Sequence, residues 1–341
     1  MKKNLMTLGV LALFVLMAYG QEKKFALYSV AFYNMENLFD TIHDEGKNDY
    51  EYLPNGTNQW NTMKYKAKLK NMSEILSLLS TDKLPMGPAI IGVSEIENYR
   101  VLEDILKQPA LADRGYQYVH YEGEDQRGVD CAFFYNPKLF ELTNSKLVPY
   151  VYINDTIHKT RGFLIASGNI AGEKMHFIVN HWPSRAAASP ARERAGEQVR
   201  AIKDSLLRED SAAKIVIMGD MNDDPMDKSM AVALGAKRKP VDAGPTDLYN
   251  PWWDTLKKGY GTLMYKGKWN LFDQIVFTGN LLGTDRSTLK FYKHEIFRRD
   301  FMFQKEGKYK GYPKRTQAGG VWLNGYSDHL PTIIYLIKEM K

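Results

Sequence analysis

A single cysteine, Cys131, occurs among the 341 residues of the chain. This scarcity excludes intramolecular disulfides, so the protein must be stabilised by a large apolar core, which a chain of this length can build. Because Cys131 begins an apolar run over residues 131–135, we expect a small buried side chain rather than a catalytic thiol.

The apolar run over residues 8–18 is too short for a comfortable membrane span. It follows the basic start Met1-Lys2-Lys3 and ends in Ala18-Tyr19-Gly20, which resembles a small-x-small cleavage site. This arrangement is typical of a secretory signal peptide. We therefore predict a signal over residues 1–20 and a secreted or periplasmic protein with no integral membrane segment after cleavage. An uncleaved anchor is the alternative, and no cysteine follows the run to carry a lipid anchor.

The remaining sequence lacks repeats, low-complexity tracts, long charge blocks and a Pro/Gly/Ser linker. Residues 21–341 are therefore predicted to form one domain, and nothing implies an obligate protein partner. The formal charge is +6, and loss of Lys2 and Lys3 with the signal lowers it to +4. This mild basicity suits a polyanionic substrate without requiring one.

Two helices follow from apolar residues spaced at helical intervals. The first covers residues 61–79. The second covers residues 189–207, where Ser189 is expected as the cap and Pro190 lies in the first turn. Because β-type runs alternate with these helices, the chain is predicted to be an α/β protein with helices outside its sheets.

Polar residues lie at the ends of the short β-type runs. Those that follow a run are Asn34 and Glu36, Glu95, Asn180 and His181, and Asp220 and Asn222. Those that precede a run are Asp130, Asp273, and Asp328 with His329. If the second group of strands is antiparallel to the first, all seven clusters meet at one edge of the sheets. Carboxylates, amides and imidazoles together suit a hard divalent cation and a polarised water. Ordinary turn chemistry is the alternative for any single cluster.

Three of these residues have the chemistry of an acid–base site. Pro183 ends the ladder after His181, so we expect His181 on a turn, as a phosphate contact or an acid. Asp220 can accept a proton or hold a water. His329 can act as a base when a carboxylate fixes its tautomer. Because adjacent strand side chains point apart, the remote Asp273 is a better candidate for that carboxylate than Asp328.

These motifs occur in the order found in one superfamily. They are Asn34, Ser94-Glu95, Asn180-His181-Trp182-Pro183-Ser184-Arg185, Gly219-Asp220-Met221-Asn222, Phe272-Asp273-Gln274-Ile275 and Ser327-Asp328-His329. Over residues 25–336 the chain resembles the endonuclease/exonuclease/phosphatase superfamily, in particular its deoxyribonuclease-like bacterial secreted branch. The resemblance implies a four-layer α/β/β/α sandwich with two packed mixed β-sheets and outer helices.

The resemblance also implies roles for individual residues. Those expected to bind Mg²⁺ or Mn²⁺ are Asn34, Glu95 and Asp328, and the match does not extend to Glu36. Those expected to be catalytic are His181, Asp220, Asn222, Asp273 and His329. Arg161 is expected to bind phosphate. Water held by Asp220 would attack the phosphorus in line, with no covalent intermediate.

Residues 297–315 interleave cations with aromatic side chains, a pattern typical of nucleic-acid binding. Lys308, Lys310 and Lys314 are the expected phosphate contacts, and an ordinary solvated loop is the alternative.

The sequence therefore predicts an exported metal-dependent endonuclease that hydrolyses DNA, or RNA. A phosphatase, a sphingomyelinase-like phospholipid phosphodiesterase and an inactive binding protein stay open. The pair Trp252-Trp253 is expected to be core and rim rather than a membrane contact.

Overall fold

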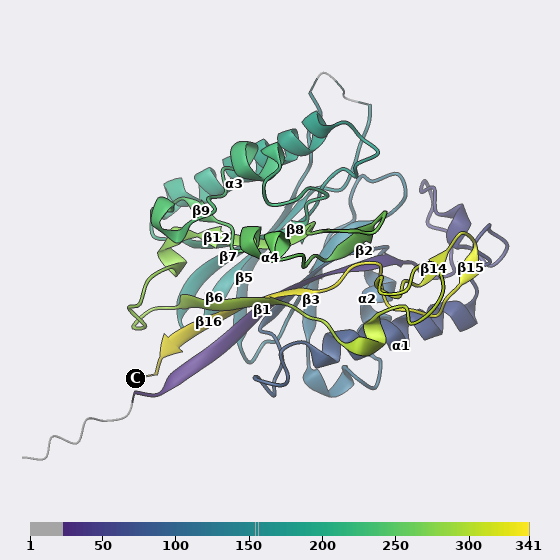
Figure 1. Ribbon diagram of the computed structural model, residues 1–341, viewed down its shortest axis with the longest axis horizontal. Helices are drawn as coiled ribbons and strands as arrows, with labels where there is room; N and C mark the ends of the chain where they lie inside the picture. Colours follow the sequence, from purple (N-terminus) through teal and green to yellow (C-terminus); the bar gives the residue numbers. More distant parts are fainter. Residues whose placement is uncertain (1–22, 154, 156, 341) are drawn as a thin grey trace, which may run out of the picture.

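Two six-stranded sheets pack face to face in the computed structural model, which describes residues 23–153, 155 and 157–340 (Figure 1). The first sheet has the order β13 (Lys290–Ile296), β16 (Thr332–Glu339), β1 (Phe25–Leu38), β2 (Ile90–Ile96), β4 (Asp130–Tyr135) and β3 (Gln117–His120). The second has the order β5 (Phe140–Val148), β6 (Phe163–Ile170), β7 (Glu173–His181), β8 (Lys214–Asp220), β12 (Asp273–Thr278) and β9 (Leu248–Tyr249). The predicted signal peptide lies outside the described residues.

The side chains of strand β1 alternate between two apolar cores, one on each face of the first sheet. Val30 and Phe32 belong to the core between the sheets, whereas Ala31 and Tyr33 belong to the core on the opposite face. This alternation follows from the two-residue period of a strand. At Gly92 in β2 the sheets approach so closely that an added Cβ would lie 2.5 Å from Sδ of Met218 in β8.

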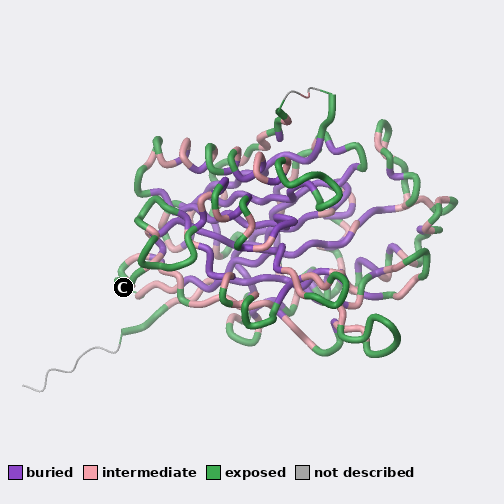
Figure 2. The backbone as a smooth tube through the Cα atoms, turned by 45° about the horizontal axis from the view of Figure 1, so that its top comes forward, coloured by how far each residue is buried: buried purple, intermediate pink, exposed green. Residues whose placement is uncertain are grey.

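Helices cover the outer faces of both sheets. Helices α1 (Thr62–Leu78) and α2 (Tyr99–Leu106) lie on the side of the first sheet, and α3 (Ser189–Glu209) lies on the opposite side, against the second sheet (Figure 1). Burial is concentrated in the strands between them (Figure 2). The predicted four-layer α/β/β/α sandwich is therefore confirmed.

The two predicted helices are present with small differences at their ends. Asn61 caps α1, since its side chain accepts a hydrogen bond from the backbone N–H of Lys64 at 3.1 Å. The predicted cap of α3 is wrong, because the N-cap residue is Ala188 and Ser189 is already helical. Its hydroxyl instead donates to Oε1 of Glu193 at 3.2 Å.

The predicted strand directions are confirmed. β12 is antiparallel to β8, β16 to β1, and β4 to β2, whereas β1–β2 and β7–β8 are parallel. The C-terminal ends of β1, β2, β7 and β8 therefore meet the N-terminal ends of β4, β12 and β16 at one edge. Cys131 and Trp252 are buried, as expected, and Trp253 is half-buried.

Smaller elements complete the fold. Two hairpins, β10 (Leu263–Tyr265) with β11 (Lys268–Asn270) and β14 (Gln317–Ala318) with β15 (Val321–Trp322), stand apart from the main sheets. The short helical segments are α4 (Trp253–Lys257), η1 (Tyr50–Tyr52), η2 (Ala112–Arg114), η3 (Ser229–Ala233), η4 (Pro240–Asp242), η5 (Gly279–Leu281) and η6 (Asp300–Met302). Within the described part of the chain, every helix is too short or too polar to cross a membrane.

Candidate active site

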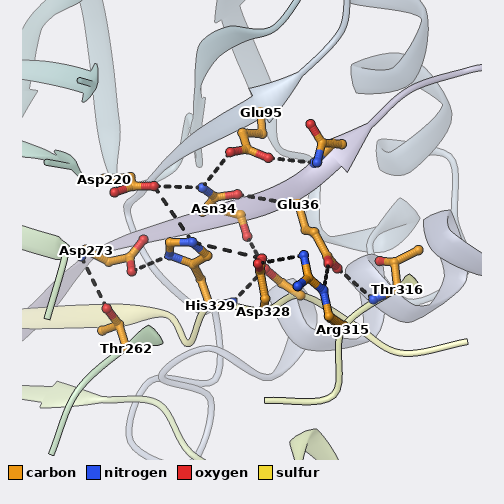
Figure 3. Close-up of polar contacts among 12 residues, drawn as sticks. Asn34, Glu36, Glu95, Asp220, Thr262, Asp273, Arg315, Thr316, Asp328 and His329 are labelled. Atoms are coloured by element: carbon orange, nitrogen blue, oxygen red, sulfur yellow. Dashed lines mark hydrogen bonds and ion pairs between the residues drawn. The ribbon is translucent and has the colours of Figure 1, made fainter. Parts of the chain in front are cut away.

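Asp220, the last residue of β8, faces Asn34 and His329 in the polar cluster (Figure 3). Its Oδ2 accepts a hydrogen bond from Nδ2 of Asn34 at 3.0 Å and lies 3.8 Å from Nε2 of both His181 and His329. Its Oδ1 accepts the backbone N–H of Asn222 at 2.9 Å. Four separate segments thus converge on one buried carboxylate.

The surroundings of Asp220 suit it to accept a proton. Burial raises its pKa to about 7, and the negative charges of Asp273 and Glu95 act in the same direction. The charge of His329 and the N–H of Asn222 oppose this effect. A carboxylate with a pKa near neutrality can take a proton from water and release it within one catalytic cycle.

His329 is held by Asp273 and not by its neighbour Asp328. Its Nδ1 lies 2.7 Å from Oδ2 of Asp273, whereas Asp328 Oδ1 lies 3.9 Å from Nε2. Burial alone would lower the pKa of His329, but the carboxylates of Asp273 and Asp220 outweigh it and hold that pKa well above its usual value. The Asp273 contact therefore leaves Nε2 facing Asp220 and favours a charged imidazole.

The Asp273→Asn variant should lower kcat on the order of 10²-fold and move the basic limb of the pH–rate profile to lower pH. The carboxylate raises the pKa of His329, so its removal lets the imidazole lose its proton earlier as the pH rises. Rates measured from pH 5 to 10 test this. A basic limb that stays in place would show that His329 does not act as a cation.

His181 lies in a different environment. It is the last residue of β7 and 5% exposed, so the expected position on a turn is wrong. Its Nε2 lies 3.6 Å from Oε1 of Glu95. Burial, reinforced by the charges of Arg161, Arg127 and His329, lowers its pKa well below the usual value, so this imidazole is neutral. Two histidines at one site therefore differ in charge, which separates their chemistry.

Glu95 and Asp220 fit a divalent cation, because their carboxylates and the His181 imidazole offer ligand atoms within 4.8 Å of one another. Asn34, also expected as a metal ligand, lies between these two carboxylates and directs its side-chain N–H groups toward them. Its Oδ1 accepts the N–H of Glu36 at 2.8 Å, and its Nδ2 donates to Asp220 and, at 3.3 Å, to Glu95. An N–H donor cannot bind a cation, so Asn34 in this orientation positions the two carboxylates.

Asp328, the third expected ligand, is engaged by an arginine. Its Oδ2 lies 2.9 Å from Nη2 of Arg315, whose Nε donates to Oε1 of Glu36 at 2.9 Å. Nζ of the buried Lys68 lies 3.7 Å from Oε2 of Glu36. Burial, with the charge of Asp328, raises the pKa of Glu36 to about 7, although the positive charges of Lys68 and Arg315 oppose this effect. This network fastens residues 315 and 316 to the end of β1 (Figure 3).

A cavity of about 340 Å³ opens beside Asp220 and the two histidines. Its other lining residues are Glu95, Arg127, Arg161, Ser184 and Asn222. Arg161 was expected to bind phosphate, but its guanidinium donates to backbone carbonyls of His181 and Trp182 and to Asp125, at 2.9–3.0 Å.

Arg127 was not identified from the sequence, and its side chain is 47% exposed. The clue in the sequence was that Arg127 lies shortly before Asp130, the polar residue that begins β4. Ser184 was missed as well, although it lies within the motif that contains His181.

A second, larger cavity of about 970 Å³ lies on the other side of Asp328. Hairpins β10–β11 and β14–β15 and residues 304–313 contribute to its wall, with Tyr265, Tyr309 and Tyr312 among the lining side chains. We call it the aromatic groove. Of the three lysines expected to contact phosphate, Lys308 lines the groove, whereas Lys310 and Lys314 are not among its lining residues.

A sequence model described as the Endonuclease/Exonuclease/phosphatase family matches residues 29–338. No curated protein matches the sequence. A family protein of Bacteroides thetaiotaomicron has a similar structure, with 15% identity, 93% of this chain and 97% of that chain covered, and a TM-score of 0.58. The mannosyl-6-phosphatase of the same organism has 15% identity, coverages of 91% and 99%, and a TM-score of 0.56. D. rerio TDP2 complexed with a single-strand DNA product has 14% identity, coverages of 91% and 99%, and a TM-score of 0.52. At these identities the similarity shows the fold alone.

Proposed function

Because the chain belongs to the endonuclease/exonuclease/phosphatase family, whose members are metal-dependent phosphoesterases, we propose that it hydrolyses a phosphoester with water held at Asp220. One observation carries the proposal. A buried carboxylate lies 3.8 Å from two imidazoles at the wall of a cavity. Such a site can activate water and stabilise charge on a phosphate.

Each residue has a role that follows from its contacts. Asp220 accepts the proton of the attacking water. Nδ2 of Asn222 donates to the carbonyl of Trp182 at 3.0 Å, which leaves its Oδ1 to orient that water. His329, held by Asp273, places positive charge beside the phosphate. His181, neutral and buried, contacts a phosphate oxygen through Nε2.

The residues proposed for the cation are Glu95 and Asp220, and Asp328, whose Oδ1 lies 3.9 Å from Nε2 of His329, is a third candidate. Mg²⁺ or Mn²⁺ is the proposed ion because these acidic ligands are oxygens. When bound, the cation neutralises charge on the phosphate and leaving oxygens. Arg127 is the better proposed phosphate contact on the protein side, because three N–H groups of Arg161 already have acceptors.

The leading substrate is nucleic acid, cleaved as by an endonuclease that acts on DNA or RNA. The aromatic groove supports this choice, since Tyr265 and Tyr309 are 61% and 50% exposed and each lies beside a lysine, Lys266 or Lys308. Exposed rings beside cations suit single-stranded bases and their phosphates. The TDP2 structure with single-strand DNA has the same fold.

A phosphomonoesterase or phosphodiesterase for small esters is the second candidate. The charged side chains that line the aromatic groove are Glu36, Glu51, Glu306, Asp328, Lys266, Lys308 and Arg315. Because four acidic side chains outnumber three basic ones, the charge of the groove does not complement a run of phosphates. The mannosyl-6-phosphatase with the same fold is consistent with this alternative.

Two double variants separate these candidates. If single-stranded nucleic acid occupies the groove, Lys266→Ala with Lys308→Ala should flatten the slope of log affinity against log salt by roughly 1.4, about 0.7 for each lost phosphate contact. Lys310→Ala with Lys314→Ala removes the same charge outside the groove and should leave the slope unchanged. Fluorescence anisotropy of a labelled oligonucleotide from 50 to 300 mM salt measures both. Equal slopes in the two variants would show that the nucleic acid binds outside the aromatic groove.

The function itself is tested with a substrate panel. The protein without residues 1–20 is incubated with plasmid DNA, RNA, a nitrophenyl phosphodiester, a sugar phosphate and sphingomyelin, each with Mg²⁺ and with chelator. Cleavage of plasmid or RNA supports the nuclease. Release of inorganic phosphate alone supports the phosphomonoesterase, and release of choline phosphate supports a lipid substrate. No turnover on any member would contradict the proposal.

We also propose that residues 1–20 are removed on export and that residues 21–341 form the catalytic domain. The basis is the basic, apolar and small-residue order of the first twenty residues. Mass spectrometry of the protein purified from outside the producing cells should give a first residue at or near Gln21. Full-length protein confined to the cytoplasm would exclude the signal.

A further inference from the structure

A third group of metal-binding side chains lies outside the site described above. Among the described residues, three groups of histidine and carboxylate side chains bring ligand atoms within 4.8 Å of one another, and two of these groups share Asp220. The third consists of His120, Glu122 and Asp130. It joins the end of β3 to the start of β4, where Asp130 pairs with Ile96, the neighbour of Glu95.

The imidazole of His120 has a buried nitrogen that needs a bonding partner. Its side chain is 4% exposed, and its Nε2 has no hydrogen-bond partner among the residues that the structure describes. Nε2 lies 3.4 Å from Oδ2 of Asp130, too far for a hydrogen bond, whereas the His329–Asp273 pair in the same protein is 2.7 Å apart. A buried polar atom without a partner destabilises the fold, and a bound cation would supply the missing partner.

The distance between the two ligand atoms also fits a cation. Tetrahedral zinc has bonds of about 2.0–2.2 Å to nitrogen and oxygen, which places neighbouring ligand atoms about 3.4 Å apart. The His120 Nε2 to Asp130 Oδ2 distance is 3.4 Å. Oε1 of Glu122 lies 3.9 Å from Nδ1, the other ring nitrogen of His120. The Glu122 side chain is 55% exposed, so it can turn toward an ion at Nε2, where water would complete the coordination.

The chemistry of the set selects the class of ion. Mg²⁺ and Ca²⁺ take oxygen ligands, so an ion that binds Nε2 of His120 belongs to Zn²⁺ and its divalent neighbours. At the catalytic edge the cation is instead proposed on the oxygens of Glu95 and Asp220, with His181 on the phosphate. We infer that His120, Glu122 and Asp130 form a second metal site, specific for a zinc-class cation and separate from the catalytic centre.

The site lies at the base of the loop that supplies Arg127. The backbone N–H of Gly123 donates to Oδ2 of Asp130 at 3.0 Å, and an added Cβ at Gly123 would lie 2.2 Å from Oδ1 of Asp130 and 3.8 Å from Cα of Arg161. Farther along, Asp125 accepts from Arg161 and Arg127 reaches the catalytic cavity. A cation on Asp130 would fix one end of this loop and so position Arg127.

The test measures metal binding rather than turnover, so it is independent of the proposed function. The background is Asp220→Asn, because Asp220 belongs to both other groups. After chelation and dialysis, this protein is titrated with Co²⁺, which reports four-coordinate geometry by its visible absorption, and Zn²⁺ is then added in competition. One strongly absorbing Co²⁺ per chain, displaced by Zn²⁺, is the expected result.

His120→Gln and Glu122→Gln in this background should each weaken Co²⁺ binding by at least about tenfold, as expected when a metal site loses a ligand or its support. Zn²⁺ in large excess over its dissociation constant should also raise Tm by roughly 3–6 °C in the background and by much less in either variant. Glu122 is exposed, so Glu122→Gln tests the site even if His120→Gln does not fold.

His158→Gln is the matched control, because Nδ1 of this exposed histidine lies 2.6 Å from Oδ2 of Asp155, and the described residues supply no third histidine, cysteine or carboxylate ligand to this pair. It should bind Co²⁺ as the background does. Unchanged Co²⁺ affinity in both His120→Gln and Glu122→Gln, or no bound Co²⁺ in the background, would overturn the inference.

Discussion

Asp220→Asn should lower kcat on the order of 10³-fold while leaving the protein folded. The substitution keeps the size of the side chain and the Oδ1 that accepts the N–H of Asn222. It removes the proton acceptor and the charge that faces His181, His329 and the proposed cation, and each such contribution is worth on the order of 10²-fold or more. Steady-state rates on the best substrate of the panel, together with thermal unfolding, measure the effect.

Asp227→Asn provides a matched control for Asp220→Asn. It changes the net charge equally and lies in the same loop, but its side chain is 38% exposed and pairs with Arg185 outside the catalytic cavity. It should keep rates within about twofold, as expected for an exposed ion pair. If the two variants lose activity to the same extent, the effect comes from the charge of the loop and not from Asp220.

Chelation should abolish turnover, and Mg²⁺ or Mn²⁺ should restore it. The ligand atoms at the catalytic edge are mainly carboxylate oxygens, and one of the two imidazoles there is already bonded to Asp273. Glu95→Gln should raise the Mg²⁺ concentration for half-maximal rate by about 10- to 100-fold, since a neutral amide binds the cation more weakly. Rates in EDTA followed by titration with each metal test both statements.

The metal titration also separates the two proposed sites. Glu95→Gln should shift the Mg²⁺ requirement without changing Co²⁺ binding at His120, Glu122 and Asp130. Full turnover in chelator would exclude a metal-dependent mechanism altogether. An unchanged Mg²⁺ requirement in Glu95→Gln would place the catalytic cation on other residues.

The sequence predicted the sheet edge well because a strand has a two-residue period and exposes polar residues where it ends. Asn34, Glu95, His181 and Asp220 follow apolar runs, and those runs became β1, β2, β7 and β8. The pairing of His329 with Asp273 could also be predicted, since neighbouring side chains in an extended chain point apart. Both inferences need only local geometry and strand direction.

Features that depend on loop packing could not be predicted. The hydrogen bonds of Arg161 are one example, because Asp125 and two backbone carbonyls lie within its reach only in the folded loop. Lys310 and Lys314 share a basic segment with Lys308, yet the turn around Gly307 and Gly311, both at positive φ, leaves only Lys308 in the groove. The direction of the Asn34 amide is fixed by the N–H of Glu36, a contact that residue spacing does not reveal.

The pairing of β1 with both β2 and β16 has a consequence for the order in which the active site is assembled. Phe25 pairs with Glu339 and Phe32 with Thr332, so the strand that carries Asn34 is completed by a partner about three hundred residues away. Contacts between such distant segments form late in folding. His329 and Asp328 precede β16 directly. A nascent chain that already contains Glu95, His181 and Asp220 would therefore remain inactive until residues 328–339 have been synthesised and paired with β1, and catalytic competence would arise in that step.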